Sequence, residues 1–149
     1  MIDVSGRLMG AMVLSAPLAA CAAPMAVGVA SELERNRLEA LDRSTLVYAR
    51  DAGIAAFMVG RCSGAGIGFS LGTSREMNLR FFDEWERRGY TADEINAAAA
   101  RISEGDIEKF RQSYFGMRGV DPTDTRAICD LARSEMDQRT TLGRMMREI

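Results

Sequence analysis

Hydrophobic residues recur along this chain at intervals of three to five positions, which is the period of helices that bury one face. Over residues 31–61, Leu38, Leu41 and Leu46 lie on such a face, and acidic residues follow Ser31 where they suit the first turn of a helix. We therefore expect a long helix over 31–61 with Ser31 as its N-cap. Alternating patterns bounded by turns, which would indicate strands, are absent from the sequence.

Turn and cap residues divide the rest of the chain into shorter helices. Residues 74–88 carry Met77, Phe81 and Trp85 four positions apart, which predicts a helix with a buried aromatic side that ends at Gly89. Three further helices are expected, each from a start signal: 92–102 from a capping box at Thr91, 104–116 from Ser103, and 122–149 from Asp121 followed by Pro122. The fold class is therefore all-α, a small helical bundle of about four to five helices braced by one disulfide.

A small residue stands at every fourth position from 52 to 72: Ala52, Ala56, Gly60, Gly64, Gly68 and Gly72. On a helix this pattern would form a smooth stripe that lets another backbone approach closely, either inside the protein or in a partner, an oligomer or a membrane. The alternative is a glycine-rich loop between helices, because each glycine inside a helix costs about 1 kcal/mol. The sequence leaves both interpretations open.

The N-terminus has the layout of an export signal. Arg7 precedes an uncharged apolar run over 8–23, which ends in small residues and is shorter than the roughly 20 residues of a comfortable transmembrane helix. Residues 18–21 resemble a lipobox, in which Cys21 would be lipidated, whereas ordinary signal peptidase would cut before Ala23. A buried Ala-rich helix is the alternative to a signal. The expected organisation is a signal over 1–22, a short linker over 23–31 and the helical domain over 32–149.

If the chain is exported, its three cysteines are expected to include one disulfide-bonded pair. Once Cys21 is removed or lipidated, Cys62 and Cys129 remain as an even pair, which in an exported chain indicates a disulfide. Closing so long a loop would stabilise the fold by roughly 4 kcal/mol. Two free buried thiols in a cytosolic protein are the alternative. No Cys-x-x-Cys motif supports thiol–disulfide catalysis.

Composition narrows the chemistry further. The chain is 47% apolar with a formal charge of -2, so it can bury a core but has no positive surplus for nucleic acid. It has no histidine, which removes the commonest general base and zinc ligand, and we expect neither a metal nor a cofactor. All of the 19 basic residues except Lys109 are arginines. We attribute this excess to genomic base composition, because acidic residues match the arginines along the chain.

Carboxylates are the remaining candidates for catalysis. Asp83, Glu84 and Glu86 lie close in sequence, as do Asp121 and Asp124, and two such groups could serve a hydrolase as acid and base. A solvated helix face explains the first cluster, and helix capping explains the second. We therefore expect no catalytic residue, and a carboxylate-dependent hydrolase is the weakest functional hypothesis.

Four features together resemble a known family: Cys62, the turn-and-cap segments 89–95 and 119–124, and Cys129. The family comprises short, exported, two-cysteine helical proteins of alphaproteobacteria and is catalogued as a domain of unknown function. The resemblance covers about residues 55–147. It implies an exported, disulfide-bonded helical domain and no particular reaction.

Two functional hypotheses follow. The favoured one is a non-catalytic protein of the periplasm or outer membrane that holds an unknown protein partner of the cell envelope on an apolar or glycine-striped face. Contact with the membrane would be only through a lipid anchor, and no nucleic-acid partner is expected. The alternative is a small inhibitor or immunity-type protein that presents an acidic loop, such as 121–124, to an envelope enzyme.

Overall fold

Helix α1 (Ala23–Cys62) is the longest element of the described residues. The computed structural model describes residues 23–149, of which Arg35–Ile149 form one compact unit and the preceding residues belong to another. The helix begins before Ser31, so the N-cap predicted there is wrong, and residues 23–31, expected as a linker, are helical. Pro24 is compatible with this early start, because proline is tolerated in the first turn of a helix.

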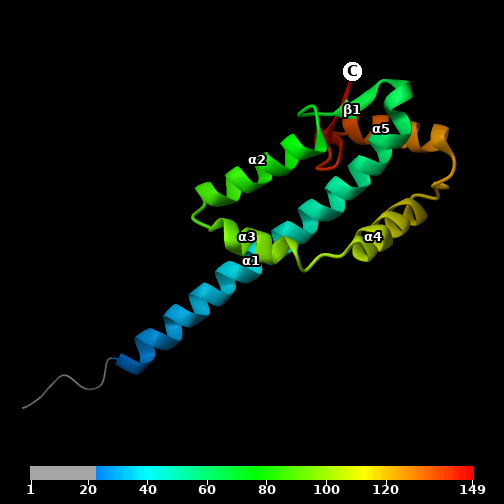
Figure 1. Cartoon of the computed structure of the whole chain (residues 1–149). Helices are drawn as coiled ribbons and strands as arrows, with labels where there is room; N and C mark the ends of the chain where they lie inside the picture. Colours follow the sequence, from blue (N-terminus) through cyan, green and yellow to red (C-terminus); the bar gives the residue numbers. More distant parts are fainter. Residues whose placement is uncertain (1–22) are drawn as a thin grey trace, which may run out of the picture. The chain divides into compact units, whose positions relative to one another are not determined.

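Four shorter helices follow α1 in the described residues. They are α2 (Ser74–Arg87), α3 (Ala92–Ala99), α4 (Glu104–Met117) and α5 (Thr125–Asp137). Figure 1 shows α2 and α4 on either side of α1, with α5 near the end of α1 that leads into β1. The predicted fold class is confirmed: the described part is mostly helical, with five α-helices and a disulfide between α1 and α5.

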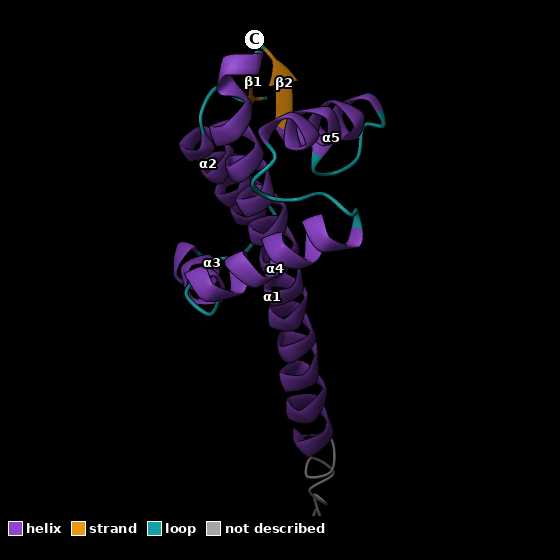
Figure 2. Ribbon diagram, turned by 90° about the vertical axis from the view of Figure 1, so that its right-hand side faces the viewer, coloured by secondary structure: helices purple, strands orange, loops and turns teal. Residues whose placement is uncertain are grey.

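A small sheet, which the sequence did not predict, lies near α5 (Figure 2). Strands β1 (Ile67–Phe69) and β2 (Met146–Glu148) pair antiparallel, and Gly68 lies opposite Arg147. The 3₁₀ helices η1 (Ser63–Ala65) and η2 (Gly143–Met145) precede the two strands. Strands of three residues are too short to produce a visible alternation of polar and apolar positions.

The capping box predicted at Thr91 is confirmed, and α4 begins after Ser103 as predicted. The Thr91 hydroxyl accepts a hydrogen bond from the backbone N–H of Glu94, and the Glu94 carboxylate accepts one from the backbone N–H of Thr91. Ser103 and Asp106 form the same reciprocal pair at the start of α4. These local contacts satisfy backbone donors that the helix itself cannot pair.

The last helix begins later than predicted. Asp124, and not Asp121, caps α5 by accepting a hydrogen bond from the backbone N–H of Ala127. Asp121 instead accepts from the backbone N–H of Thr123 at 2.7 Å and closes a turn before the helix. Pro122 therefore lies in this turn, because the nearer aspartate takes the capping role.

The chain reverses direction after α5 and does not continue as a helix to Ile149. Arg139 adopts a left-handed φ of 51°. Gly143 then lies so close to the backbone of Glu135 that a Cβ at this glycine would stand 1.9 Å from the Glu135 carbonyl oxygen. This close approach requires glycine and brings β2 beside β1.

The small-residue pattern does not form one helical stripe. Gly60 lies in α1, but the helix ends at Cys62, and Gly64, Gly68 and Gly72 lie in η1, in β1 and in the turn after it. Gly72 has a φ of 92°, which a helix cannot accommodate. The loop interpretation is therefore correct after Cys62, and the continuous helical stripe is wrong there.

Two hydrophobic clusters form along α1. The disulfide cluster surrounds the cystine and draws on α1, β1, α4, α5 and β2; its largest fully buried side chains are Ile54, Met58, Ile67, Phe115 and Ile128. The tryptophan cluster draws on α1, α2 and α3; it contains Leu41, Trp85, Ile95 and Ala98, with Phe81, Phe82 and Tyr90 packed against it.

Candidate binding groove

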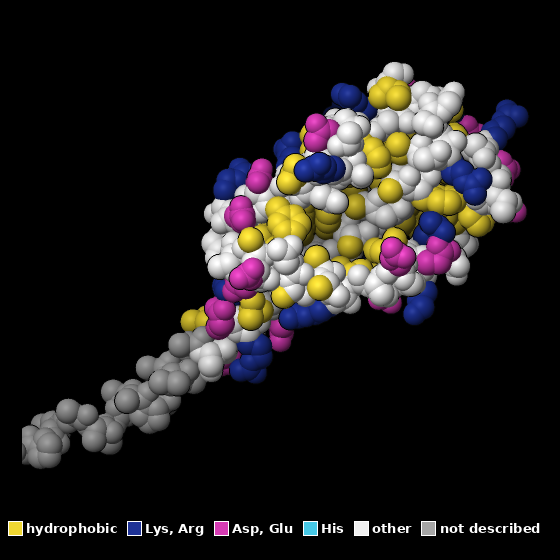
Figure 3. Space-filling view, viewed as in Figure 1, with side chains coloured by type: hydrophobic (Ala, Val, Ile, Leu, Met, Phe, Trp, Pro, Cys, Tyr) yellow, Lys and Arg dark blue, Asp and Glu magenta, His cyan; other side chains and the backbone are white. Residues whose placement is uncertain are grey.

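An apolar groove follows α1. Figure 1 shows the two helices that flank α1 here, α2 and α4. Its floor is made of small residues of α1, namely Ala49, Ala52, Gly53 and Ala56, and its volume is about 360 Å³. Figure 3 shows this face hollowed between the helices, with hydrophobic side chains around the hollow. A pocket of this size lies within the roughly 300–1,000 Å³ typical of ligand sites.

The spacing of the floor residues explains the shape of the groove. Positions 49, 52, 53 and 56 follow the i, i+3, i+4, i+7 spacing, so they lie on one face of α1. Their side chains extend no farther than Cβ, which leaves room over the backbone. At Gly53 this room is used within the domain, because an added Cβ would stand 2.4 Å from the Cγ2 of Ile107 in α4.

Aromatic side chains of α2 form one wall. Phe81 stacks on Tyr48 of α1 with ring centroids 4.2 Å apart, and Phe82 lies beside it with its ring nearly perpendicular to that of Phe81. The Tyr48 hydroxyl donates to Oδ1 of Asn78 at 2.7 Å. Burial raises the pKa of Tyr48 to about 12, so the phenol remains a neutral donor at physiological pH. The other wall contains Ile102 and Ile107.

The structure brings only part of the predicted small-residue surface to this groove. Ala52 and Ala56 line it. Gly60 and Gly64 have no atom within 4 Å of an added Cβ, whereas Gly68 packs against the side chain of Ile149. Since the four glycines lie on different elements, they form no common surface. The small-residue pattern therefore predicts a contact surface only over the positions that lie within α1.

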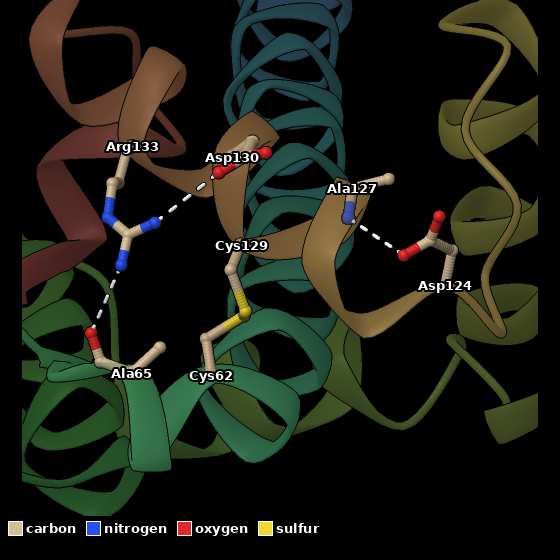
Figure 4. The surroundings of a disulfide bond; sticks show 7 residues. All are labelled: Cys62, Ala65, Asp124, Ala127, Cys129, Asp130 and Arg133. Atoms are coloured by element: carbon tan, nitrogen blue, oxygen red, sulfur yellow. Dashed lines mark hydrogen bonds and ion pairs between the residues drawn. A yellow bond between two sulfur atoms is a disulfide. The ribbon is translucent and has the colours of Figure 1, made fainter.

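The disulfide lies apart from the groove, at the end of α1. It joins Cys62 to Cys129 of α5 with Cα atoms 5.6 Å apart, as the cysteine count predicts. Beside it, Arg133 donates to the carbonyl oxygen of Ala65 at 3.2 Å and pairs with Asp130 (Figure 4). These contacts fix α5 against the end of α1. Cys21, the candidate for lipidation, and the predicted signal over 1–22 lie outside the described residues.

A second cleft, about 530 Å³ in volume and lined by both polar and apolar side chains, lies between α1, α4 and the segment after α5. Glu135 in its lining is 5% exposed and accepts hydrogen bonds from Tyr114 at 2.5 Å, from Arg118 at 2.8 Å and from Thr140. Burial raises the pKa of Glu135, but the donors Thr140 and Tyr114 and the charge of Arg118 outweigh it, and the net pKa is lowered. Glu135 is therefore an ionised carboxylate that ties α4 to the C-terminal segment.

Asp51 also lines this second cleft and is 5% exposed. Sequence reasoning missed both Asp51 and Glu135, because their proximity depends on how α1 and α5 pack. One signal was present: Glu135 stands seven positions after Ile128, on the buried face of its helix. An acidic residue at such a position requires partners within the fold.

The carboxylates that the sequence analysis considered as catalytic candidates do not lie together in either cleft. Asp83, Glu84 and Glu86 are exposed on α2, and Glu84 pairs with Arg88. Asp121 and Asp124 shape the turn before α5. Within the described residues, neither set lines either cleft as a pair of carboxylates.

Comparisons with known proteins place the chain in a family. None of the described helices is both long and apolar enough to cross a membrane. No curated protein and no solved structure matches the chain. One sequence family matches residues 49–147, a segment that includes both bonded cysteines, the floor of the groove and all of α2 to α5. The predicted resemblance to a family of unknown function is thereby confirmed, and the chain belongs to DUF5333, a family of unknown function.

Proposed function

We propose that this protein is an exported, non-catalytic helical domain that binds a partner protein through the groove on α1. The observation that carries the proposal is the floor of small residues at Ala49, Ala52 and Ala56 between two apolar walls. Small residues on a helix face let a second helix approach closely, and apolar walls provide the surface that binding removes from water.

A helix of the partner is the occupant that fits this groove. The lining positions on α1 run from Thr45 to Ala56, which corresponds to about 16 Å along the helix axis, or three turns. The walls formed by α2 and α4 lie on either side (Figure 1), so an added helix would lie over α1 and between them. We expect its apolar residues to be three and four positions apart, which is the usual pattern of a helix bound in a groove.

Two observations rank this function above its alternatives. Asp121 and Asp124 each use a carboxylate oxygen in the turn before α5, so turn formation and helix capping account for both residues without an inhibitory role. Glu135 accepts hydrogen bonds from three side chains and has a lowered pKa, which makes it unsuited to act as a general acid.

The export part of the proposal rests on the sequence over 1–22 and agrees with the disulfide, because disulfides persist in oxidising compartments. Intact mass spectrometry of the membrane and soluble envelope fractions, with and without reductant, tests it. A chain that starts at Cys21 with an acyl mass indicates a lipoprotein, and one that starts near Ala23 with an oxidised cysteine pair indicates a soluble periplasmic protein. An unprocessed chain with three free thiols contradicts export.

Site-specific crosslinking in the producing cell tests the groove. A photoreactive residue is placed at Ala56, which is exposed and lines the groove, and in a matched control at Ala97, which is exposed on α3 outside it. We expect one protein adduct from position 56 that is absent from position 97. The adduct is digested and the linked peptide identified.

The identity of the linked peptide decides the outcome. A segment of another protein with apolar residues at helical spacing supports the proposal. Adducts to lipid or to a second copy of this chain contradict it, as does an identical adduct pattern from both positions.

A further inference from the structure

Four arginines line a cleft of about 530 Å³ beside the C-terminal segment: Arg133, Arg139, Arg144 and Arg147. We call this the arginine cleft. Asp137 and Glu148 are the acidic residues of its lining. Even when the pairing of Arg133 with Asp130 is counted, the cleft is positive, whereas the chain as a whole has a formal charge of -2.

Two of the four guanidinium groups are already engaged. Arg133 donates to the carbonyl oxygen of Ala65, and Arg144 donates to the carbonyl oxygen of Arg139 at 2.8 Å. In the described part of the chain, no hydrogen bond or ion pair engages the guanidinium groups of Arg139 and Arg147, both of which are exposed. These two groups are available to a ligand.

Arg139 stands at a position that favours glycine. Helices α2 and α4 each end with a glycine in the left-handed conformation, Gly89 with φ 90° and Gly119 with φ 65°. Their closing hydrogen bonds, such as that from the backbone N–H of Tyr90 to the carbonyl oxygen of Trp85, are those of a helix C-cap. Helix α5 ends in the same way, but with Arg139 at φ 51°.

An arginine at this position strains the backbone, since a Cβ disfavours the left-handed conformation. The strain is not required by the fold, because glycine closes the same turn at the ends of α2 and α4. Glycine would close this turn with less strain, but it would not supply a guanidinium group to the cleft. The surrounding segment is rigid: Thr140 donates to the carboxylate of Glu135 and accepts from the backbone N–H of Gly143.

We propose that the arginine cleft binds a phosphate group, with Arg139 and Arg147 as its principal ligands. Each guanidinium offers paired N–H donors that match two oxygens of one anion. Two uncommitted guanidinium groups suit the several oxygens of a phosphate better than the two oxygens of a single carboxylate. The phosphate could belong to a soluble phosphate ester or to a phospholipid headgroup. This proposal does not depend on the groove on α1.

Binding is measured with the purified full-length protein and two probes. Inorganic phosphate is titrated by calorimetry, and vesicles of phosphatidylglycerol are compared with vesicles of phosphatidylcholine by sedimentation. We expect Arg139→Gly to weaken phosphate binding by roughly tenfold or more, because it removes hydrogen bonds to a charged group. The same variant should raise the urea midpoint of unfolding, because glycine relieves the left-handed strain.

Matched variants complete the test. Arg147→Gln should also weaken phosphate binding, whereas Arg126→Gln should not, because Arg126 is exposed on α5 but does not line the cleft. Binding of phosphate alone indicates a soluble ester, and additional binding of phosphatidylglycerol vesicles indicates a headgroup. The proposal is overturned if neither probe binds, if binding survives Arg139→Gly, or if Arg126→Gln weakens it equally.

Discussion

The disulfide cluster and the tryptophan cluster pack on the same helix but are held together differently. The disulfide cluster is joined covalently and contains the fully buried Phe115. The tryptophan cluster has a smaller buried centre, and partly exposed rings complete it. Arg37 lies over the ring of Tyr90 at 4.6 Å, and Arg88 lies over the ring of Trp85 at the same distance.

The two clusters contribute differently to the groove on α1. Phe81 and Phe82, which form its wall on α2, belong to the edge of the tryptophan cluster, and Gly53 of the floor precedes Ile54 of the disulfide cluster. We infer that the disulfide cluster holds the scaffold while the tryptophan cluster shapes the binding surface. Side chains at the edge of a small cluster adjust to a partner at lower cost than those of a closed core.

Removal of the disulfide is expected to have the largest effect on stability. Cys62→Ser combined with Cys129→Ser opens a link across 67 residues and should lower the free energy of unfolding by about 4 kcal/mol. Urea unfolding followed by circular dichroism, which reports on all the helices, measures the change. The fluorescence of Trp85, the single tryptophan, reports separately on the tryptophan cluster. The emission of the folded variant should equal that of the wild type, because the tryptophan cluster does not contain the cystine. A shifted native emission would contradict the independence of the two clusters.

The next largest effect is expected for Gly143→Ala. This substitution should lower the free energy of unfolding by about 3 kcal/mol, because the new Cβ would overlap the backbone of Glu135. Gly60→Ala is the matched control: nothing lies within 4 Å of its added Cβ, and it lies inside α1. This control should stabilise the protein by about 0.5–1 kcal/mol. Thermal unfolding of both variants measures the contrast, and equal effects would refute the account of the C-terminal reversal.

Glu135→Gln is expected to lower the free energy of unfolding by about 2 kcal/mol near neutral pH, because three donors lose a charged acceptor. The pKa of Glu135 in the folded protein is lowered from its ordinary value of 4.5. Its contribution to stability is therefore fully present above that value and is lost as the pH falls through the lower folded-state pKa.

The wild type should accordingly lose its advantage over Glu135→Gln on acidification. The pKa values of Glu94, Asp106 and Asp121 are lowered too, but these groups titrate in both proteins and cancel in the comparison. Urea midpoints measured from about pH 7 to about pH 3 test the prediction. A constant difference between the two proteins over this range would show that the charge of Glu135 does not stabilise the fold.

The smallest expected effect concerns the start of α3. Thr91→Ala removes one half of a capping box and should cost about 1 kcal/mol. Because Ile95 and Ala98 of this helix belong to the tryptophan cluster, amide hydrogen exchange in α3 should quicken more than exchange in α5. Uniform acceleration in both helices would mean that the two clusters unfold as one unit.

Local features could be predicted from the sequence, and features that depend on distant contacts could not. Thr91 and Ser103 were readable as caps because the residues that complete each box stand three positions later. The reversal after α5 was not readable, since it depends on the left-handed conformation of Arg139 and on the contact between Gly143 and Glu135. The alanines of the groove floor were visible as a pattern, but its walls exist only once α2 and α4 have packed against α1.

The yield of the protein adduct from position 56 in groove-filling variants tests the central claim most directly. Ala52→Phe places a large side chain on the floor of the groove, whereas Ala97→Phe adds the same side chain on exposed α3. If the groove holds a partner helix, Ala52→Phe should abolish the adduct while Ala97→Phe leaves it unchanged, with both variants retaining the wild-type circular dichroism. An undiminished adduct in Ala52→Phe would show that the partner binds elsewhere.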